Sequence, residues 1–193
     1  MEKLGLASLL RGDNENAIKY YMEAIEIYKR GPNRDDNNLA QCYNIIGVAY
    51  KNNKEYSKAI EYYNKAIEIY KQMYPNEDNK DLAVCYNNIG TAIYKAEEYD
   101  ESIINYKKAI KIYETVHPNR DNEDLASCYK NIGIAFKNNK KYADSIKYFN
   151  QAIEIYKKLY PNRDNKDLDS CYKNLESARK YTSGASSSSN YNS

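Results

Sequence analysis

The chain repeats itself with a period of 43 residues. The segment Leu39-Ala-Gln-Cys-Tyr-Asn-Ile-Ile-Gly47 returns as Leu82-Ala-Val-Cys-Tyr-Asn-Asn-Ile-Gly90 and as Leu125-Ala-Ser-Cys-Tyr-Lys-Asn-Ile-Gly133. Its opening returns once more as Leu168-Asp-Ser-Cys-Tyr-Lys-Asn-Leu175. A fixed period of about 20 to 50 residues is typical of stacked supersecondary units. The sequence therefore predicts an elongated array of repeats rather than one globular core.

Each complete repeat carries the apolar spacing of two α-helices. In the first complete copy, residues recurring at intervals of three and four predict one helix over 39–51 and a second over about 56–73. The polar linker 52–54 between them is short enough to require an antiparallel hairpin. Gly47 and Ala66 are expected where neighbouring helices touch closely, because a larger side chain would hold the backbones apart.

The repeats define the organisation of the chain. We expect a truncated first repeat at 1–38, complete repeats at 39–81, 82–124 and 125–167, a C-terminal capping helix at 168–181 and a Ser/Asn-rich tail at 182–193. The tail has low complexity and little to bury, which predicts disorder. The sequence leaves open whether the natural protein begins with a shortened repeat or whether this chain is a piece of a longer array.

Charge and hydropathy exclude several classes of protein. The formal net charge is only +2, so no strong field calls for nucleic acid or an anionic membrane as a partner. No apolar run reaches transmembrane length, and residues 1–5 lack the apolar core of a secretion signal. We therefore expect a soluble, cytoplasmic protein.

Four cysteines occupy the same position in successive repeats: Cys42, Cys85, Cys128 and Cys171. A disulfide needs Cα atoms within about 7 Å, whereas equivalent points on neighbouring helices lie about 8–10 Å apart or more. Zinc would need clustered ligands, but the chain has no C-x-x-C motif and one histidine. The pattern favours small buried thiols, which also suit a reducing compartment.

No catalytic or metal-binding arrangement is found in the sequence. His117, the only histidine, stands immediately before Pro118 and is expected to have a capping or solvent-exposed role. The Asp/Asn-rich loops after the second helices lack the glycine and closing glutamate of a calcium loop. Nucleophile, zinc-protease and phosphate-loop motifs are missing as well. We expect no catalytic residues, no metal site and no cofactor.

The repeat resembles the tetratricopeptide repeat, whose pattern is an aromatic residue, Leu-Gly, Tyr, Ala-x-x-x-Phe and Pro in fixed order. The first complete copy shows this order as Tyr43, Ile46-Gly47, Tyr50, Ala59, Tyr63 and Pro75. The usual unit has about 34 residues, and the longer unit found here is similar to the repeats of kinesin light chains. The resemblance implies an all-α, right-handed solenoid of antiparallel helix pairs. It also implies a concave face that is lined by the first helices and commonly binds peptides.

The stretches 39–51, 82–95 and 125–138 contain lysines but no Asp or Glu. If they line the concave face, that face is locally positive and attracts anionic partners. A row of amides beside the lysines offers both donors and acceptors for a peptide backbone. The residues proposed to bind peptide are Asn44, Asn87, Asn88, Lys95, Lys130, Asn131, Lys137, Lys173 and Asn174. The alternative is a solvated polar face in a protein rich in Asn and Lys.

These observations lead to two functional hypotheses, beside a third in which the chain is a regulatory segment of a larger enzyme. The first is a non-enzymatic scaffold that binds a short, acidic peptide segment of a protein partner. The second is a structural repeat module that associates with itself through terminal faces, for example near Leu4, Leu6, Leu9 and Leu10. In the second case the chain is a fragment or a consensus-like array without a dedicated peptide ligand.

Overall fold

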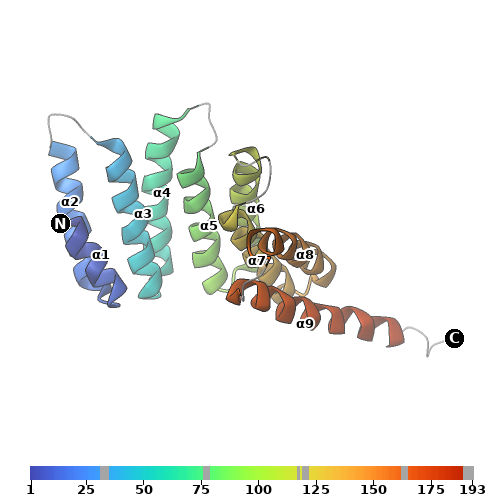
Figure 1. Cartoon of the computed structure of the whole chain (residues 1–193). Helices are drawn as coiled ribbons and strands as arrows, with labels where there is room; N and C mark the ends of the chain where they lie inside the picture. Colours follow the sequence, from blue (N-terminus) through green and yellow to red (C-terminus); the bar gives the residue numbers. More distant parts are fainter. Residues whose placement is uncertain (31–34, 76–78, 117, 119–121, 162–164, 189–193) are drawn as a thin grey trace. The chain divides into compact units, whose positions relative to one another are not determined.

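A computed structural model of the chain describes residues 1–30, 35–75, 79–116, 118, 122–161 and 165–188, with side chains up to residue 182. The described residues form nine α-helices: α1 (Glu2–Leu10), α2 (Asn14–Arg30), α3 (Asp36–Asn52), α4 (Tyr56–Met73), α5 (Lys80–Lys95), α6 (Tyr99–Val116), α7 (Glu123–Asn138), α8 (Tyr142–Leu159) and α9 (Lys166–Ser188) (Figure 1). No described residue lies in a strand, so the all-α prediction is confirmed.

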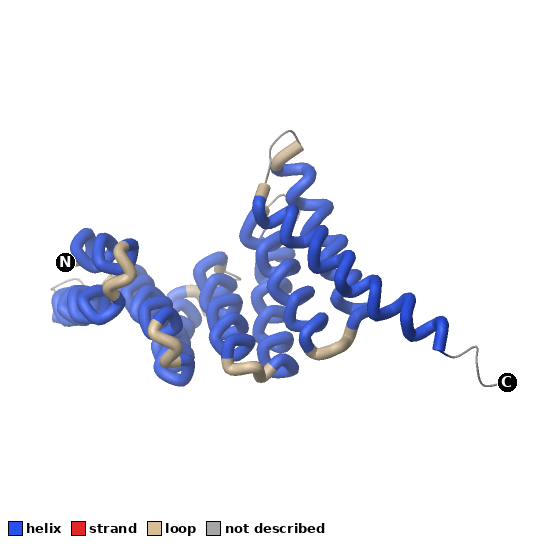
Figure 2. Tube along the Cα trace, turned by 90° about the horizontal axis from the view of Figure 1, so that it is seen from below, coloured by secondary structure: helices blue, strands red, loops and turns tan. Residues whose placement is uncertain are grey.

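The helices form two compact units, Met1–Ala96 with α1 to α5 and Glu97–Ser193 with α6 to α9. Within each unit, every helix packs against the next one along the chain. The turns between the two helices of a repeat are short, for example 53–55 and 139–141 (Figure 2). The first helices also touch one another, α3 with α5 in the first unit and α7 with α9 in the second. Their shared surface is called here the first-helix face of each unit.

The core of each unit is a stripe of small and aromatic residues on the second helices. In α4, Ala59, Tyr63, Ala66 and Tyr70 are at most 2% exposed. Their spacing of three and four residues places them on one side of the helix, against α3 and α5. The apolar periodicity in the sequence therefore identified the buried face of α4 correctly, and α4 has the expected bounds.

The first helices begin earlier than the sequence suggested, because polar residues cap them. Asp35 accepts a hydrogen bond from the Asn38 amide at 3.0 Å, and Asn122 accepts one from the Leu125 amide at 2.9 Å. Asn79 and Asn165 cap α5 and α9 in the same way. The first helices therefore do contain acidic residues in their first turns: Asp36, Asp81, Glu123, Asp124, Asp167 and Asp169.

The last helix runs further than expected. The sequence predicted its end at residue 181, but α9 continues to Ser188. Tyr181 stacks on Tyr142 of α8 with ring centroids 4.7 Å apart, and the Thr182 hydroxyl donates to the Arg179 carbonyl. These two contacts hold the turn of α9 around Tyr181 in place. Each further helical residue then adds a hydrogen bond without a new nucleation cost. Residues 189–193 lie outside the described part of the chain.

The turn between the two helices of a repeat uses a left-handed residue each time. Gly12 has a φ of 77°, and the equivalent positions are Lys54 at 64°, Glu97 at 65° and Lys140 at 59°. Only glycine takes this conformation without a steric cost. Three of the four described turns therefore carry backbone strain.

We expect Lys54→Gly and Lys140→Gly each to raise the free energy of unfolding by about 0.5–1 kcal/mol, because glycine removes the strain of the left-handed backbone. Urea unfolding followed by circular dichroism measures the change. Gly12→Ala is the matched control, since it places a side chain at the same turn position and should lower stability. If both lysine variants were less stable than the parent, backbone strain at these turns would not lower the free energy of unfolding.

Candidate functional site

In the first unit, the structure joins two of the predicted amides. The Asn88 side-chain NH₂ donates to the Asn44 side-chain oxygen at 3.0 Å, linking α5 to α3. The backbone carbonyl of Asn87 accepts a hydrogen bond from the Thr91 hydroxyl, and the Asn87 side chain is half-buried. Lys95 is exposed at the end of α5. The first-helix face of this unit therefore carries a linked amide pair at one level and a lysine two turns further along.

Lys51 belongs to the same face, although the sequence analysis left it out of the proposed contacts. It lies two helical turns after Asn44, as Lys95 does after Asn88. Its side chain is half-buried, and burial together with the charge of Lys95 lowers the pKa of Lys51. Among the residues that the structure describes, no carboxylate forms an ion pair with Lys51. Two cations therefore share a small area without a local counter-charge.

In the second unit, the predicted lysines already have partners. The Lys130 ammonium binds the Asp167 carboxylate at 2.5 Å, and the Lys137 ammonium donates to the Asn174 side-chain oxygen at 2.5 Å. Both contacts join α7 to α9. Asn131 is half-buried, and Lys173 is exposed. Lys173 and Asn174 line a pocket of about 300 Å³ on α9, so the structure brings these two predicted residues together.

Substitutions between repeats distinguish the two faces: Asn44 of the first unit corresponds to Lys130 of the second, and Lys95 corresponds to Tyr181. Lys137 is the counterpart of Lys51, and its acceptor Asn174 is the counterpart of Asn88. In the second unit Lys130 reaches Asp167 and leaves Asn174 to accept from Lys137. In the first unit the counterpart of Lys130 is Asn44, which holds the Asn88 amide instead. Lys51 is the residue left with a second cation beside it.

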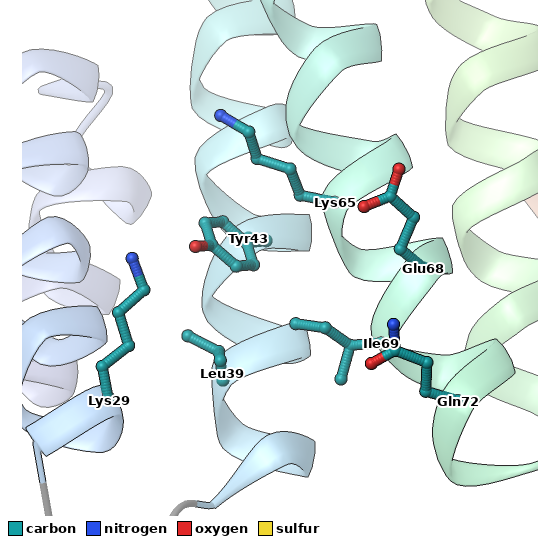
Figure 3. A pocket seen from close by; sticks show the side chains of 7 residues that line it. All are labelled: Lys29, Leu39, Tyr43, Lys65, Glu68, Ile69 and Gln72. Atoms are coloured by element: carbon teal, nitrogen blue, oxygen red, sulfur yellow. The ribbon is translucent and has the colours of Figure 1, made fainter.

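Another pocket of the first unit is lined by two second helices and one first helix. It has a volume of about 380 Å³ and is lined from α2, α3 and α4 by Lys29, Leu39, Tyr43, Lys65, Glu68, Ile69 and Gln72 (Figure 3). In Figure 3 the Tyr43 ring lies with Lys29 to its left and the Lys65 side chain above it. This pocket is not predicted from the sequence, because its lining comes from two adjacent repeats.

All four cysteines are unpaired thiols and buried. Burial raises the pKa of the Cys42, Cys85 and Cys171 thiols to about 12, so they stay protonated and poorly nucleophilic at neutral pH. The described residues contain no group of three or more His, Cys, Asp or Glu side chains suited to a metal. His117 and loop residues 76–78, 119–121 and 162–164 lie outside the described part.

Hydropathy excludes a membrane-spanning helix within the described chain, since none is both long and apolar enough to cross a bilayer.

Comparison with known proteins supports the repeat architecture. A sequence model described as tetratricopeptide repeat matches residues 1–72 and 78–158. None of the curated proteins compared with the chain matches it.

Several solved structures are similar to the chain. BtubC (BKLC) from P. vanneervenii superposes with a TM-score of 0.83 at 20% identity, over 93% of this chain and 70% of that protein. The apo form of RapI gives 0.76 at 18% identity, over 93% of this chain and 47% of RapI. A protein described as a kinesin light chain with nearly identical TPR-like repeats, from Podospora anserina, gives 0.75 at 12% identity, over 95% and 85%. At these identities the similarity establishes a shared solenoid fold and nothing about ligands.

Proposed function

Because this chain belongs to the tetratricopeptide repeat family, whose members are generally non-enzymatic scaffolds for protein–protein interaction, we propose that it binds a short acidic peptide segment of a partner protein on its first-helix face. The observation that carries the proposal is Lys51 beside Lys95. A half-buried cation next to a second cation is electrostatically unfavourable, and a carboxylate placed between the two ammonium groups would relieve this cost.

The amides give this face a way to hold a peptide backbone. Asn44 and Asn88 stand two turns before the lysines on α3 and α5, and their mutual hydrogen bond holds both side chains in one orientation. An extended peptide that placed its acidic side chain at Lys51 and Lys95 would pass over this amide pair. Asn87 is expected to contribute at the edge of the same surface.

In the second unit we expect the predicted lysines to have different roles from one another. Lys130 and Lys137 are engaged with Asp167 and Asn174, so their first role is to fix α9 against α7. Lys173 is exposed beside Asn174 in the pocket on α9, and it is the cation of this unit that we expect to contact an acidic ligand. Asn131 and Asn174 remain the proposed backbone contacts.

The experiment selects peptides from a random displayed library against the full chain, and then measures the affinity of a selected peptide for variants by titration. We expect enrichment of acidic sequences and a loss of affinity of about tenfold or more for Lys51→Gln with Lys95→Gln, since both ammonium contacts to the ligand carboxylate disappear. Binding should also weaken with added salt. The control pair is Lys19→Gln with Lys158→Gln, which removes the same charge from exposed positions on second helices.

Two outcomes would contradict the proposal. If no acidic sequence is enriched, the first-helix face does not bind such peptides. If the control pair weakens binding as much as the Lys51 and Lys95 pair, only the net charge matters, and the assigned positions are wrong.

A specific observation favours self-association as the second candidate. Five large apolar side chains on α1 and α2 and at the first residue are about half exposed or more: Met1, Leu4, Leu6, Leu10 and Ile27. Two of them, Met1 and Ile27, line one pocket of about 330 Å³, and an exposed apolar surface of this kind is typical of one that another protein covers. We expect sedimentation equilibrium over a hundredfold range of concentration to show a dimer that Leu6→Glu abolishes. A monomer at every concentration would remove this candidate.

A further inference from the structure

The pocket of Figure 3 offers anion-binding groups above an apolar floor. Leu39 and Ile69 form the floor and are buried at 2% and 8% exposure. The Lys29 ammonium lies 6.0 Å from the centroid of the Tyr43 ring. The Lys65 ammonium lies 4.3 Å from the ring of Tyr62, which itself packs against Tyr43 at 6.1 Å. Two cations are therefore held by aromatic rings at the mouth of one pocket.

Both lysines are available to a ligand although each has an acidic neighbour. Lys29 is 3.8 Å from Glu26, and Lys65 is 2.7 Å from Glu61, in both cases within the same helix. The side chains of these pairs are 39% to 60% exposed. Exposed pairs of this kind contribute about 0.2–0.5 kcal/mol, so a bound anion displaces them at small cost.

In the second unit the equivalent position is lined by different residues, and the equivalent tyrosine, Tyr129, is buried. Glu114 occupies the position of Lys29, and Gln151 that of Lys65. The Tyr129 hydroxyl, equivalent to that of Tyr43, donates to the Glu114 carboxylate, and Tyr129 is only 1% exposed. Tyr43 is half-buried by contrast. The tyrosine is therefore buried where its neighbour is Glu114, and it lines a pocket where its neighbour is Lys29.

We propose that the pocket of Lys29, Tyr43 and Lys65 is a second docking site, which takes a carboxylate carried on an apolar stem from an acidic segment of a partner protein. The carboxylate binds the two ammonium groups and the tyrosine hydroxyl, and the stem packs on Leu39 and Ile69. Glu68 also lines the pocket and repels a doubly charged group such as a phosphate, so a single negative charge fits better. The site shares no residue with the Lys51 and Lys95 surface and does not depend on it.

The test uses 3-phenylpropionate as the probe and follows the methyl signals of Leu39 and Ile69 by NMR during titration of the full chain. We expect saturable shifts at millimolar concentration. The neutral amide of the same molecule should bind at least about fivefold more weakly than the acid, because it lacks the charge. Equal binding of acid and amide, or unshifted methyl signals, would overturn the proposal.

Residue exchange between the units provides the matched variants. Lys29→Glu with Lys65→Gln copies the second unit into the first and should abolish the shifts, while keeping a pairing that the chain already uses. Glu114→Lys with Gln151→Lys should create saturable shifts at Leu125 and Ile155, the equivalent floor residues. If the first exchange leaves the affinity unchanged, the assignment is wrong. Lys51→Gln with Lys95→Gln should leave this binding intact, which separates it from the peptide proposal above.

Discussion

Gly47→Ala is expected to lower the free energy of unfolding by about 1–3 kcal/mol, although alanine in an open helical position would raise it by about 1 kcal/mol. A Cβ atom at Gly47 would lie 2.6 Å from Cε1 and 2.7 Å from Cδ1 of Tyr63. Tyr63 is fully buried, so its ring has no space into which it can move. The sign of the change therefore reports the close contact between α3 and α4. Urea unfolding followed by circular dichroism measures it.

Two further variants make the Gly47 prediction specific. Gly133→Ala should cost less, because the nearest ring atoms of Phe149 lie at 2.9 Å. In a Tyr63→Leu background the ring is gone, and Gly47→Ala should then cost clearly less than in the parent. Equal costs in both backgrounds would mean that the penalty does not come from the Tyr63 ring.

The fold could be predicted from the sequence because its determinants are local. The spacing of Ala59, Tyr63, Ala66 and Tyr70 defines one face of α4, and all four residues are buried as that spacing requires. The first-helix boundaries were less well predicted. Asp35 and Asn79 lie in loops with several possible capping residues, and only the backbone geometry shows which side chain accepts the amide hydrogen bond.

The candidate site was predicted less completely because it depends on contacts between repeats. No sequence pattern indicates that Lys130 binds Asp167, which lies 37 residues further along the chain. Without that contact, all lysines of the first helices look equally available, and Lys51 does not stand out. The pocket of Figure 3 had a detectable signal. The position held by Lys29 carries lysine in three repeats and glutamate only at Glu114. This exception indicates that the surroundings of Tyr129 differ from those of Tyr43.

Raising the pH from 9 to 10 is expected to lower the free energy of unfolding by about 1 kcal/mol for each buried thiol. Burial raises the pKa of the Cys42, Cys85 and Cys171 thiols from 9.0 to about 12, and it raises the pKa of Cys128 as well. The unfolded chain therefore releases these protons above pH 9, while the folded chain keeps them. The stabilisation is fully present below pH 9 and is lost as the pH approaches 12.

The variant with all four cysteines replaced by alanine isolates this effect. Alanine leaves small cavities and lowers stability at every pH, so the comparison concerns the change between pH 9 and pH 10 rather than the absolute value. Burial also raises the pKa of seven tyrosines, Tyr21, Tyr28, Tyr62, Tyr63, Tyr70, Tyr148 and Tyr156. An unfolded tyrosine is only half ionised at pH 10, so each contributes about a third of the effect of a thiol in this window. We expect the variant to lose most of the pH dependence. If parent and variant show the same slope, other groups cause the alkaline loss of stability, and the thiols do not stay protonated because of their burial.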